Sequence, residues 1–182
     1  MPIRALAPLL ALCSTLFVGA AACGSGSATR QVAAYITVPS PAPSTQAQRQ
    51  KLAKSRFALS AGLAAGAIQQ WIVKPWKAGA FADGAQGRTA TLLKAGLAGT
   101  FAYDRLKGAR YNAQGDPALA RALAPVSASV DALKHLPGKL RRGDASAVAA
   151  FDAVIRKVKA AGKSAGAPVH NQVPSGPQLA RG

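Results

Sequence analysis

The feature that most constrains the fold is a run of apolar residues that steps by four, three, four and three along the chain. Asp116 and Pro117 stand before this run, as a helix cap and as a first helical residue whose missing N–H costs nothing. The spacing puts the apolar side chains on one helical face and predicts a seam for a bundle or coiled-coil contact. Pro125 predicts a kink inside this helix, and Leu136-Pro137-Gly138 predicts its end. The apolar residues are Leu119, Leu123, Val126, Val130 and Leu133.

Helical apolar spacing extends over residues 44–162 and predicts three further helices. The first begins with Ser44 or Thr45 as its cap, runs to about Val73, and is stopped by Pro75. A glycine-punctuated loop over residues 74–87 then leads to a second helix from about Arg88 to Asn112.

The last predicted helix is capped by Asp144 and closed by Gly162, after a basic loop over residues 139–143. Its apolar stripe consists of Val148, Phe151, Ile155 and Val158. Four helices joined by short connections predict an all-α fold, a small antiparallel helical bundle of about four helices after a flexible N-terminal tether.

Small residues mark two of these helices. Gly62-x-x-x-Gly66 lies in the first helix, and the sequence of residues 61–64 (Ala-Gly-Leu-Ala) recurs at residues 95–98. We interpret both as faces that let helix 1 pack closely against helix 2. The apolar run over residues 57–68 is shorter than the roughly 20 residues of a membrane span, which favours a buried helix. Membrane insertion of residues 57–73 is the alternative.

The start of the chain has the layout of a signal peptide. Arg4 precedes an apolar stretch, and small residues lead up to Cys23. Ala20-Ala21-Ala22-Cys23, followed by a Gly/Ser segment, resembles the lipobox of bacterial lipoproteins, although that family usually has Leu or Val in place of Ala20. The resemblance implies removal of residues 1–22 and attachment of a diacylglyceryl group to Cys23. The alternative is an ordinary secreted protein in which Cys23 is incidental.

The resemblance also implies a location at the extracytoplasmic face of the cell membrane, with the lipid at Cys23 as the anchor. Residues 23–43 are then a lipid-attached flexible tether, because Gly/Ser and Pro-rich segments form spacers. The helical domain comprises residues 44–162. Residues 163–182 are rich in Gly, Pro, Ala and Gln without periodicity, which predicts a disordered tail.

The inventory of chemically reactive residues is poor. The chain has two histidines, and its six acidic residues are all aspartates. We predict no catalytic residue, no metal site and no cofactor, because neither a nucleophile–histidine arrangement nor a cluster of metal-ligating oxygens can be identified. An unrecognised enzyme is the alternative, and it would require Asp104 or Asp152 to converge with His135 in a pocket.

Positive charge is the one excess in the composition. Lys and Arg number 23 against six aspartates, which gives a formal net charge of +17. Such charge predicts attraction to an anionic partner, here anionic lipid or an anionic wall polymer, and a solvated cationic surface is the plain alternative. Export makes nucleic acid an unexpected partner, and the sequence identifies no protein partner. The residues predicted to contact an anionic surface are Arg49, Lys51, Lys54, Arg56, Lys139, Arg141 and Arg142.

These observations lead to the hypothesis of a membrane-anchored lipoprotein whose helical domain is a non-catalytic envelope module for binding or structure. A carrier that holds a hydrophobic ligand between its helices is the first alternative, and the enzyme is the second. An apolar cavity of roughly 300 Å³ or more inside the bundle would favour the carrier, whereas a solid core would favour the module.

Overall fold

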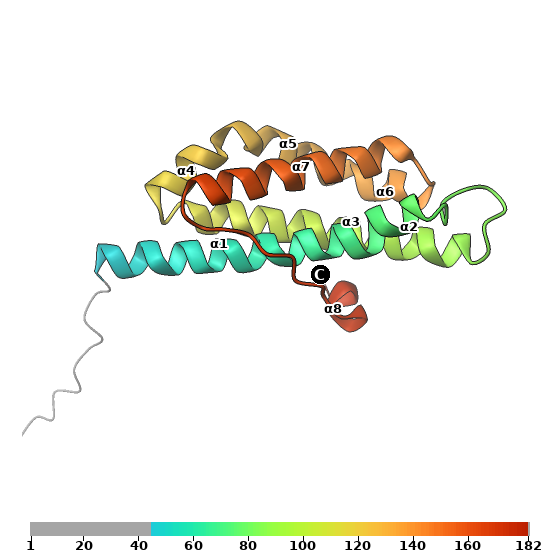
Figure 1. Cartoon of the computed structure of the whole chain (residues 1–182), viewed down its shortest axis with the longest axis horizontal. Helices are drawn as coiled ribbons and strands as arrows, with labels where there is room; N and C mark the ends of the chain where they lie inside the picture. Colours follow the sequence, from blue (N-terminus) through green and yellow to red (C-terminus); the bar gives the residue numbers. More distant parts are fainter. Residues whose placement is uncertain (1–44, 182) are drawn as a thin grey trace, which may run out of the picture. The chain divides into compact units, whose positions relative to one another are not determined.

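The computed structural model describes residues 45–181, and this part of the chain is helical without a strand. Helix α1 (Gln46–Ile68), helix α3 (Arg88–Ala113), the broken helical segment 117–141 and helix α7 (Ala145–Ser164) form the bundle (Figure 1). The predicted all-α helical bundle is therefore confirmed. The predicted signal peptide and the whole predicted tether (residues 23–43) lie outside the described residues.

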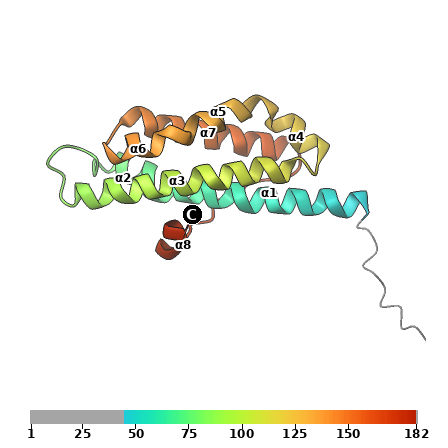
Figure 2. The same cartoon turned by 180° about the vertical axis from the view of Figure 1, so that it is seen from behind.

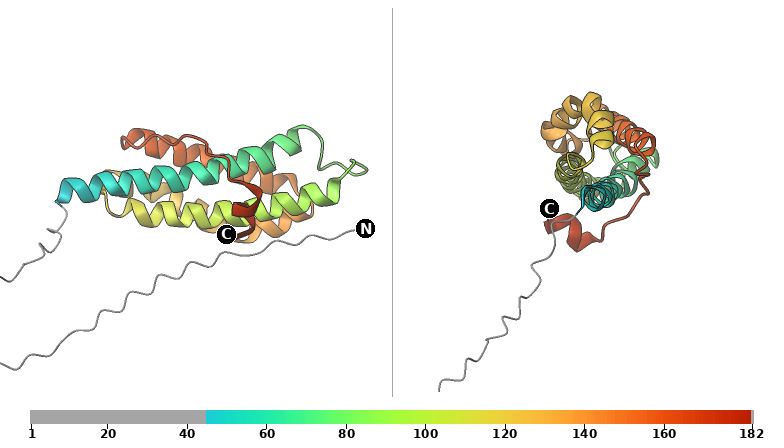
Figure 3. Two further views of the ribbon diagram at one scale, coloured as in Figure 1. Left: turned by 90° about the horizontal axis from the view of Figure 1, so that it is seen from below. Right: turned by 90° about the vertical axis from the view of Figure 1, so that its left-hand side faces the viewer.

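The bundle encloses one core that depends on close approach of the helices. Seen from behind, α1 and α3 run side by side in opposite directions, and the end-on view shows the helical segments around a common centre (Figures 2 and 3). Phe57, Phe101 and Phe151 are fully buried at this centre. Alanines such as Ala61 and Ala98 are also fully buried, so the helix backbones can lie close together.

The first helix continues past the proline that was expected to stop it. A π-helical turn over Gln69–Val73 follows α1, and α2 (Lys74–Lys77) then carries Pro75 in its first turn. The prediction that Pro75 ends the helix is wrong. The wider π turn relieves the crowding that a proline ring causes in the preceding turn, and a first-turn position does not need the missing N–H. The N-cap of α1 is Thr45: its side-chain oxygen accepts a hydrogen bond from the Gln48 N–H, and its own N–H donates one to the Gln48 side chain.

The connection from α2 to α3 contains the predicted glycine turns, but it begins later than the predicted loop over residues 74–87, because Lys74–Lys77 are helical. Gly79, Gly84 and Gly87 all have positive φ angles, which glycine adopts without strain. Inside the loop, the Arg88 Nε donates a hydrogen bond of 2.9 Å to the carbonyl oxygen of Phe81. The second predicted helix matches α3 to within one residue.

The third predicted helix is broken more often than expected. Asp116 caps it by accepting a 2.9 Å hydrogen bond from the Leu119 N–H, and the whole apolar seam is buried. However, Leu136-Pro137-Gly138 does not end it, because Pro137 lies in the first turn of a further helix that buries Leu140. The successive elements are α4 (Pro117–Leu123), a 3-10 turn (Ala124–Val126), α5 (Ser127–Ala132), a second 3-10 turn (Leu133–His135) and α6 (Leu136–Arg141).

The end of the chain differs from the disordered tail that composition predicts. Residues 165–175, which we name the C-terminal strap, pack against α1 and lead into α8 (Gly176–Arg181) (Figure 1). The Gln172 N–H donates a 2.9 Å hydrogen bond to the Gly62 carbonyl, and the Lys159 ammonium donates one of 3.0 Å to the Asn171 side chain. The strap is extended and is held partly through its backbone, so helical periodicity could not reveal it.

The two glycines of α1 leave the space in which the backbone of the strap lies. A Cβ at Gly62 would lie 2.5 Å from the His170 carbonyl oxygen, and one at Gly66 would fall on the backbone of Gln172. On α3, by contrast, Gly96 lies against the Arg141 side chain and Gly99 against Leu140 and Phe151. The prediction that these glycines form the contact between helix 1 and helix 2 is wrong, although the two helices do pack together.

Residues 57–73 belong to this packed bundle. Phe57, Ile68, Ile72 and Val73 are all buried within the hydrophobic core. Of the helices between residues 45 and 181, none combines the length and the apolar run that crossing a membrane would require.

Candidate functional site

The first group of predicted surface residues lies on the N-terminal half of α1. Arg49, Lys51 and Arg56 are exposed to solvent, and Lys54 is half-buried. The Lys54 ammonium lies 3.8 Å from the carboxylate of Asp116, which is buried and also caps α4. Lys54 therefore links α1 to the start of α4, whereas Arg49, Lys51 and Arg56 are the more solvent-exposed basic side chains of this group.

The second group lies at the other end of the bundle. Lys139 and Arg141 belong to the last turn of α6, Arg142 follows it, and all three are exposed. The α6–α7 connection and the start of α1 are at opposite ends of the bundle (Figure 1). The structure thus places the two predicted groups far apart, and they do not form a single site.

Two exposed apolar side chains extend the first group. Leu52 is 51% exposed and Tyr111 is 74% exposed, although large hydrophobic side chains are usually buried. Together with Arg49 and Arg56 they line an open groove between α1 and the end of α3. Sequence analysis missed both residues. The spacing of three and four between Arg49, Leu52 and Arg56 could have identified the α1 side of this groove.

The same side of α1 and α3 is covered further along by the end of the chain. Seen from below, the strap crosses the C-terminal half of α1, α8 lies against α3, and the N-terminal half of α1 extends beyond them (Figure 3). Leu179 of α8 and Pro174 of the strap are buried. The groove at Leu52 and Tyr111 is therefore the uncovered part of a surface that the protein covers elsewhere.

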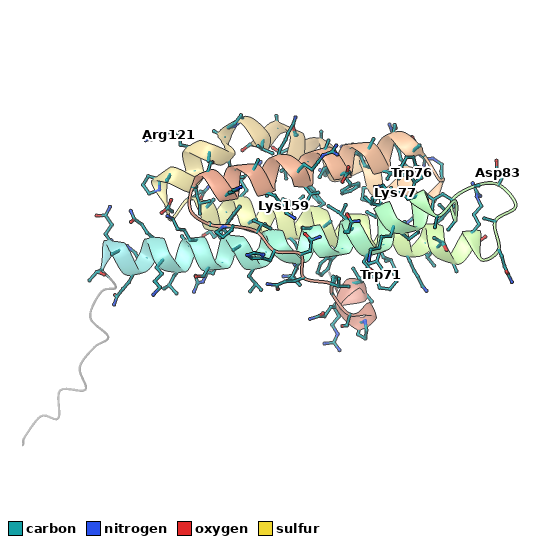
Figure 4. The ribbon with its side chains drawn as sticks, viewed as in Figure 1. Trp71, Trp76, Lys77, Asp83, Arg121 and Lys159 are labelled. Carbon is teal, nitrogen blue, oxygen red and sulfur yellow. The ribbon has the colours of Figure 1, made fainter. Side chains whose placement is uncertain are left out.

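The two tryptophans have different surroundings at the end of the first helix (Figure 4). Trp71 packs against the core, and the Lys94 ammonium lies 5.9 Å from the centre of its ring. Trp76 on α2 is 42% exposed. Trp71 is therefore a partly buried aromatic beside the core, and Trp76 is the more exposed of the two.

The residues named for the enzyme alternative, His135 with Asp104 or Asp152, are not paired with one another. His135 and Asp104 are both exposed, and Asp152 pairs with Arg156 on the same helix at 3.0 Å. Within residues 45–181, no hydrogen bond or ion pair joins His135 to either aspartate, and no group of three potential metal ligands exists.

One carboxyl group has a shifted pKa, and capping explains it. The side chain and the backbone N–H of Ser146 donate hydrogen bonds that hold the pKa of Asp144 below its ordinary value, and the backbone bond is 2.8 Å long. Asp144 caps α7, as predicted from the sequence. This shift reflects a helix cap and does not indicate a catalytic group.

The centre of the bundle is solid. The space left among Phe57, Leu106 and Val158 is about 10 Å³, which is about the room of one water molecule. A ligand pocket usually needs at least ~300 Å³. This space is therefore too small for a hydrophobic ligand.

The comparisons with known proteins add no assignment to this geometry. No protein family model, no curated protein sequence and no solved structure matches the chain.

Proposed function

We propose that this chain is a lipid-anchored protein of the cell envelope whose helical domain is a non-catalytic module for contact with an anionic surface. The anchor is the cysteine of the lipobox-like sequence, Cys23. The partner is the anionic lipid of the membrane that holds the anchor, or an anionic polymer of the wall.

The net charge of the chain carries this proposal. Six aspartates can neutralise only a small part of the charge of 23 lysines and arginines. Five of the six aspartates already cap a helix or form an ion pair within the described residues: Asp83, Asp116, Asp131, Asp144 and Asp152. A protein with such an excess attracts anionic surfaces and repels copies of itself.

The solid core supports a module over a carrier. A carrier needs an apolar cavity, and the space of about 10 Å³ at the centre of the bundle is far below that need. We therefore make no proposal of ligand transport.

Vesicle sedimentation tests the surface contact. The full chain with Cys23→Ser, which carries no lipid, is mixed with vesicles that contain phosphatidylglycerol, and vesicles of phosphatidylcholine serve as the control. We expect it to sediment with the anionic vesicles at low salt and to be released at high salt, because salt screens exposed charges. A chain that stays in solution with anionic vesicles at low salt would contradict the electrostatic contact.

Cell fractionation tests the anchor. We expect Cys23→Ser to be released into the medium or to stay unprocessed, because a diacylglyceryl group gives stable membrane attachment. Cys13→Ser, in the predicted leader, is the matched control and should leave lipidation unchanged. Correct cleavage with full membrane retention of Cys23→Ser would overturn the anchor assignment.

A further inference from the structure

We infer that the domain lies on anionic lipid through one defined surface, the docking face, formed by Arg49, Leu52, Arg56 and Leu59 of α1 and Tyr111 of α3. This inference rests on the proposed function and adds to it the orientation of the domain and the residues that touch the bilayer.

Helical geometry brings the four α1 residues together. Their spacing of three, four and three residues puts them on one stripe of the helix. Leu52 and Leu59 are each 51% exposed, so the stripe alternates arginine with accessible leucine. Tyr111, on the adjacent end of α3, lines the same groove as Arg49, Leu52 and Arg56.

This combination of side chains suits a bilayer surface better than a soluble polymer. Arginines bind lipid phosphates, leucines enter the apolar layer just below them, and tyrosine favours the boundary between the two. A polyanion needs only the charges and leaves exposed leucine without a role. The Asp116 carboxylate, which forms an ion pair with Lys54 on α1, is buried and also accepts a hydrogen bond from the Leu119 N–H, so its negative charge is partly balanced by Lys54.

The chain itself supports the choice of lipid. α1 begins with Thr45 as its cap, and the Arg49 N–H donates its first-turn hydrogen bond to Thr45. The segment that holds the predicted lipid site at Cys23 therefore joins the helix one turn before the docking face. A lipid anchor on that segment keeps the domain close to a membrane and so raises the effective concentration of lipid for this face.

A fluorescent probe locates the contact. In the full chain with Cys13→Ser and Cys23→Ser, an NBD group is attached to a cysteine at Tyr111→Cys and, in a separate protein, at Ala149→Cys on the exposed surface of α7. Vesicles containing phosphatidylglycerol should shift the emission of the probe to the blue at position 111 and leave it unchanged at position 149. Because both proteins share the predicted leader, any insertion of the leader affects them equally.

Charge variants give a second measurement on the same protein. Arg49→Gln with Arg56→Gln should weaken vesicle binding about tenfold or more, since each basic residue at an anionic surface contributes about 1 kcal/mol. Arg141→Gln with Arg142→Gln removes the same charge at the other end of the bundle and should weaken binding less than about threefold. Equal loss in the two pairs would overturn the docking face.

The remaining outcomes separate this inference from the proposed function. Salt-dependent sedimentation without a shift at position 111, or with equal shifts at both positions, would overturn the docking face and leave the surface contact standing. Absence of both sedimentation and shift would overturn both. Binding of soluble poly(glycerol phosphate) through Arg49 and Arg56, with unshifted emission on vesicles, would overturn the lipid assignment in favour of a polymer.

Discussion

The two halves of α1 belong to one continuous helix but meet very different surroundings. In the C-terminal half, Gly62 and Gly66 allow the backbone of the strap to lie directly on the helix. In the N-terminal half, Leu52 remains exposed beside Arg49 and Arg56, and Leu59, just past the middle of the helix, is exposed as well. The difference shows that the fold covers the half where side chains are absent and leaves open the half where large side chains and charge project.

The largest expected effect on stability comes from adding a side chain at a glycine that the strap covers. Gly66→Ala puts a methyl group where the backbone of Gln172 lies, and backbone cannot move aside as a flexible side chain can. We expect a loss of about 2 kcal/mol in the free energy of unfolding, as for overpacking in a core. Limited proteolysis should then cut the strap between residues 165 and 175.

Gly108→Ala on α3 is the matched control, because a Cβ there meets nothing within 4 Å. This change should stabilise the protein by about 0.5–1 kcal/mol, since alanine favours a helix over glycine. If Gly66→Ala were as stable as Gly108→Ala in urea unfolding, the covered half would not depend on its glycines.

Weakening the packing of α8 tests whether the strap and α8 stabilise only the C-terminal half of α1 or the whole helix. Leu179 is buried, so Leu179→Ala should cost about 1.5 kcal/mol, below the usual range for a central leucine because a terminal helix can detach. Hydrogen exchange should speed up in α8 while the N-terminal half of α1 keeps its protection. Val173→Ala, at an exposed strap residue, should change neither quantity, and faster exchange in the N-terminal half would show that the two halves are not independent.

The ion pair between Lys54 on the open half of α1 and Asp116 at the start of α4 should have a smaller effect on stability. Asp116→Ala removes the α4 cap and the partner of Lys54, and should cost about 1 kcal/mol in denaturant unfolding. Asp116→Asn keeps a capping oxygen and should recover most of that loss. An asparagine variant as unstable as the alanine variant would assign the stabilisation to the ion pair and not to the cap.

The smallest effect is expected in the open half. Leu52→Ser with Tyr111→Ser should change the free energy of unfolding by less than about 0.5 kcal/mol, because both side chains are exposed. Thermal unfolding measures this directly. A loss well above 1 kcal/mol would mean that these side chains hold the fold together, which would end the contrast between the two halves.

Much of this fold could be predicted from local signals. The Asp116 and Asp144 caps, the glycine turns before α3 and the buried seam from Leu119 to Leu133 all depend on residues near one another in sequence. Pro75 and Pro137 misled the prediction, because a proline is tolerated in a first turn and the preceding helix can continue as a π or 3-10 segment.

The rest depends on contacts between distant parts of the chain. Nothing near residues 165–175 indicates that their backbone pairs with Gly62, since an extended strap has no helical period. The basic half of the candidate site was predicted, but Leu52 and Tyr111 were not. They come from two helices, and only the packing of α1 against α3 brings them to one groove.

The strap also sets the order in which the domain is completed. Synthesis delivers α1 first and the segment that covers Gly62 and Gly66 last, so this contact joins the beginning of the described domain to its end. Contacts of such sequence separation form slowly, because a long loop must close before they are made. Until residues 165–175 are available, the glycine surface of α1 is uncovered, and the domain lacks the stability that this contact adds.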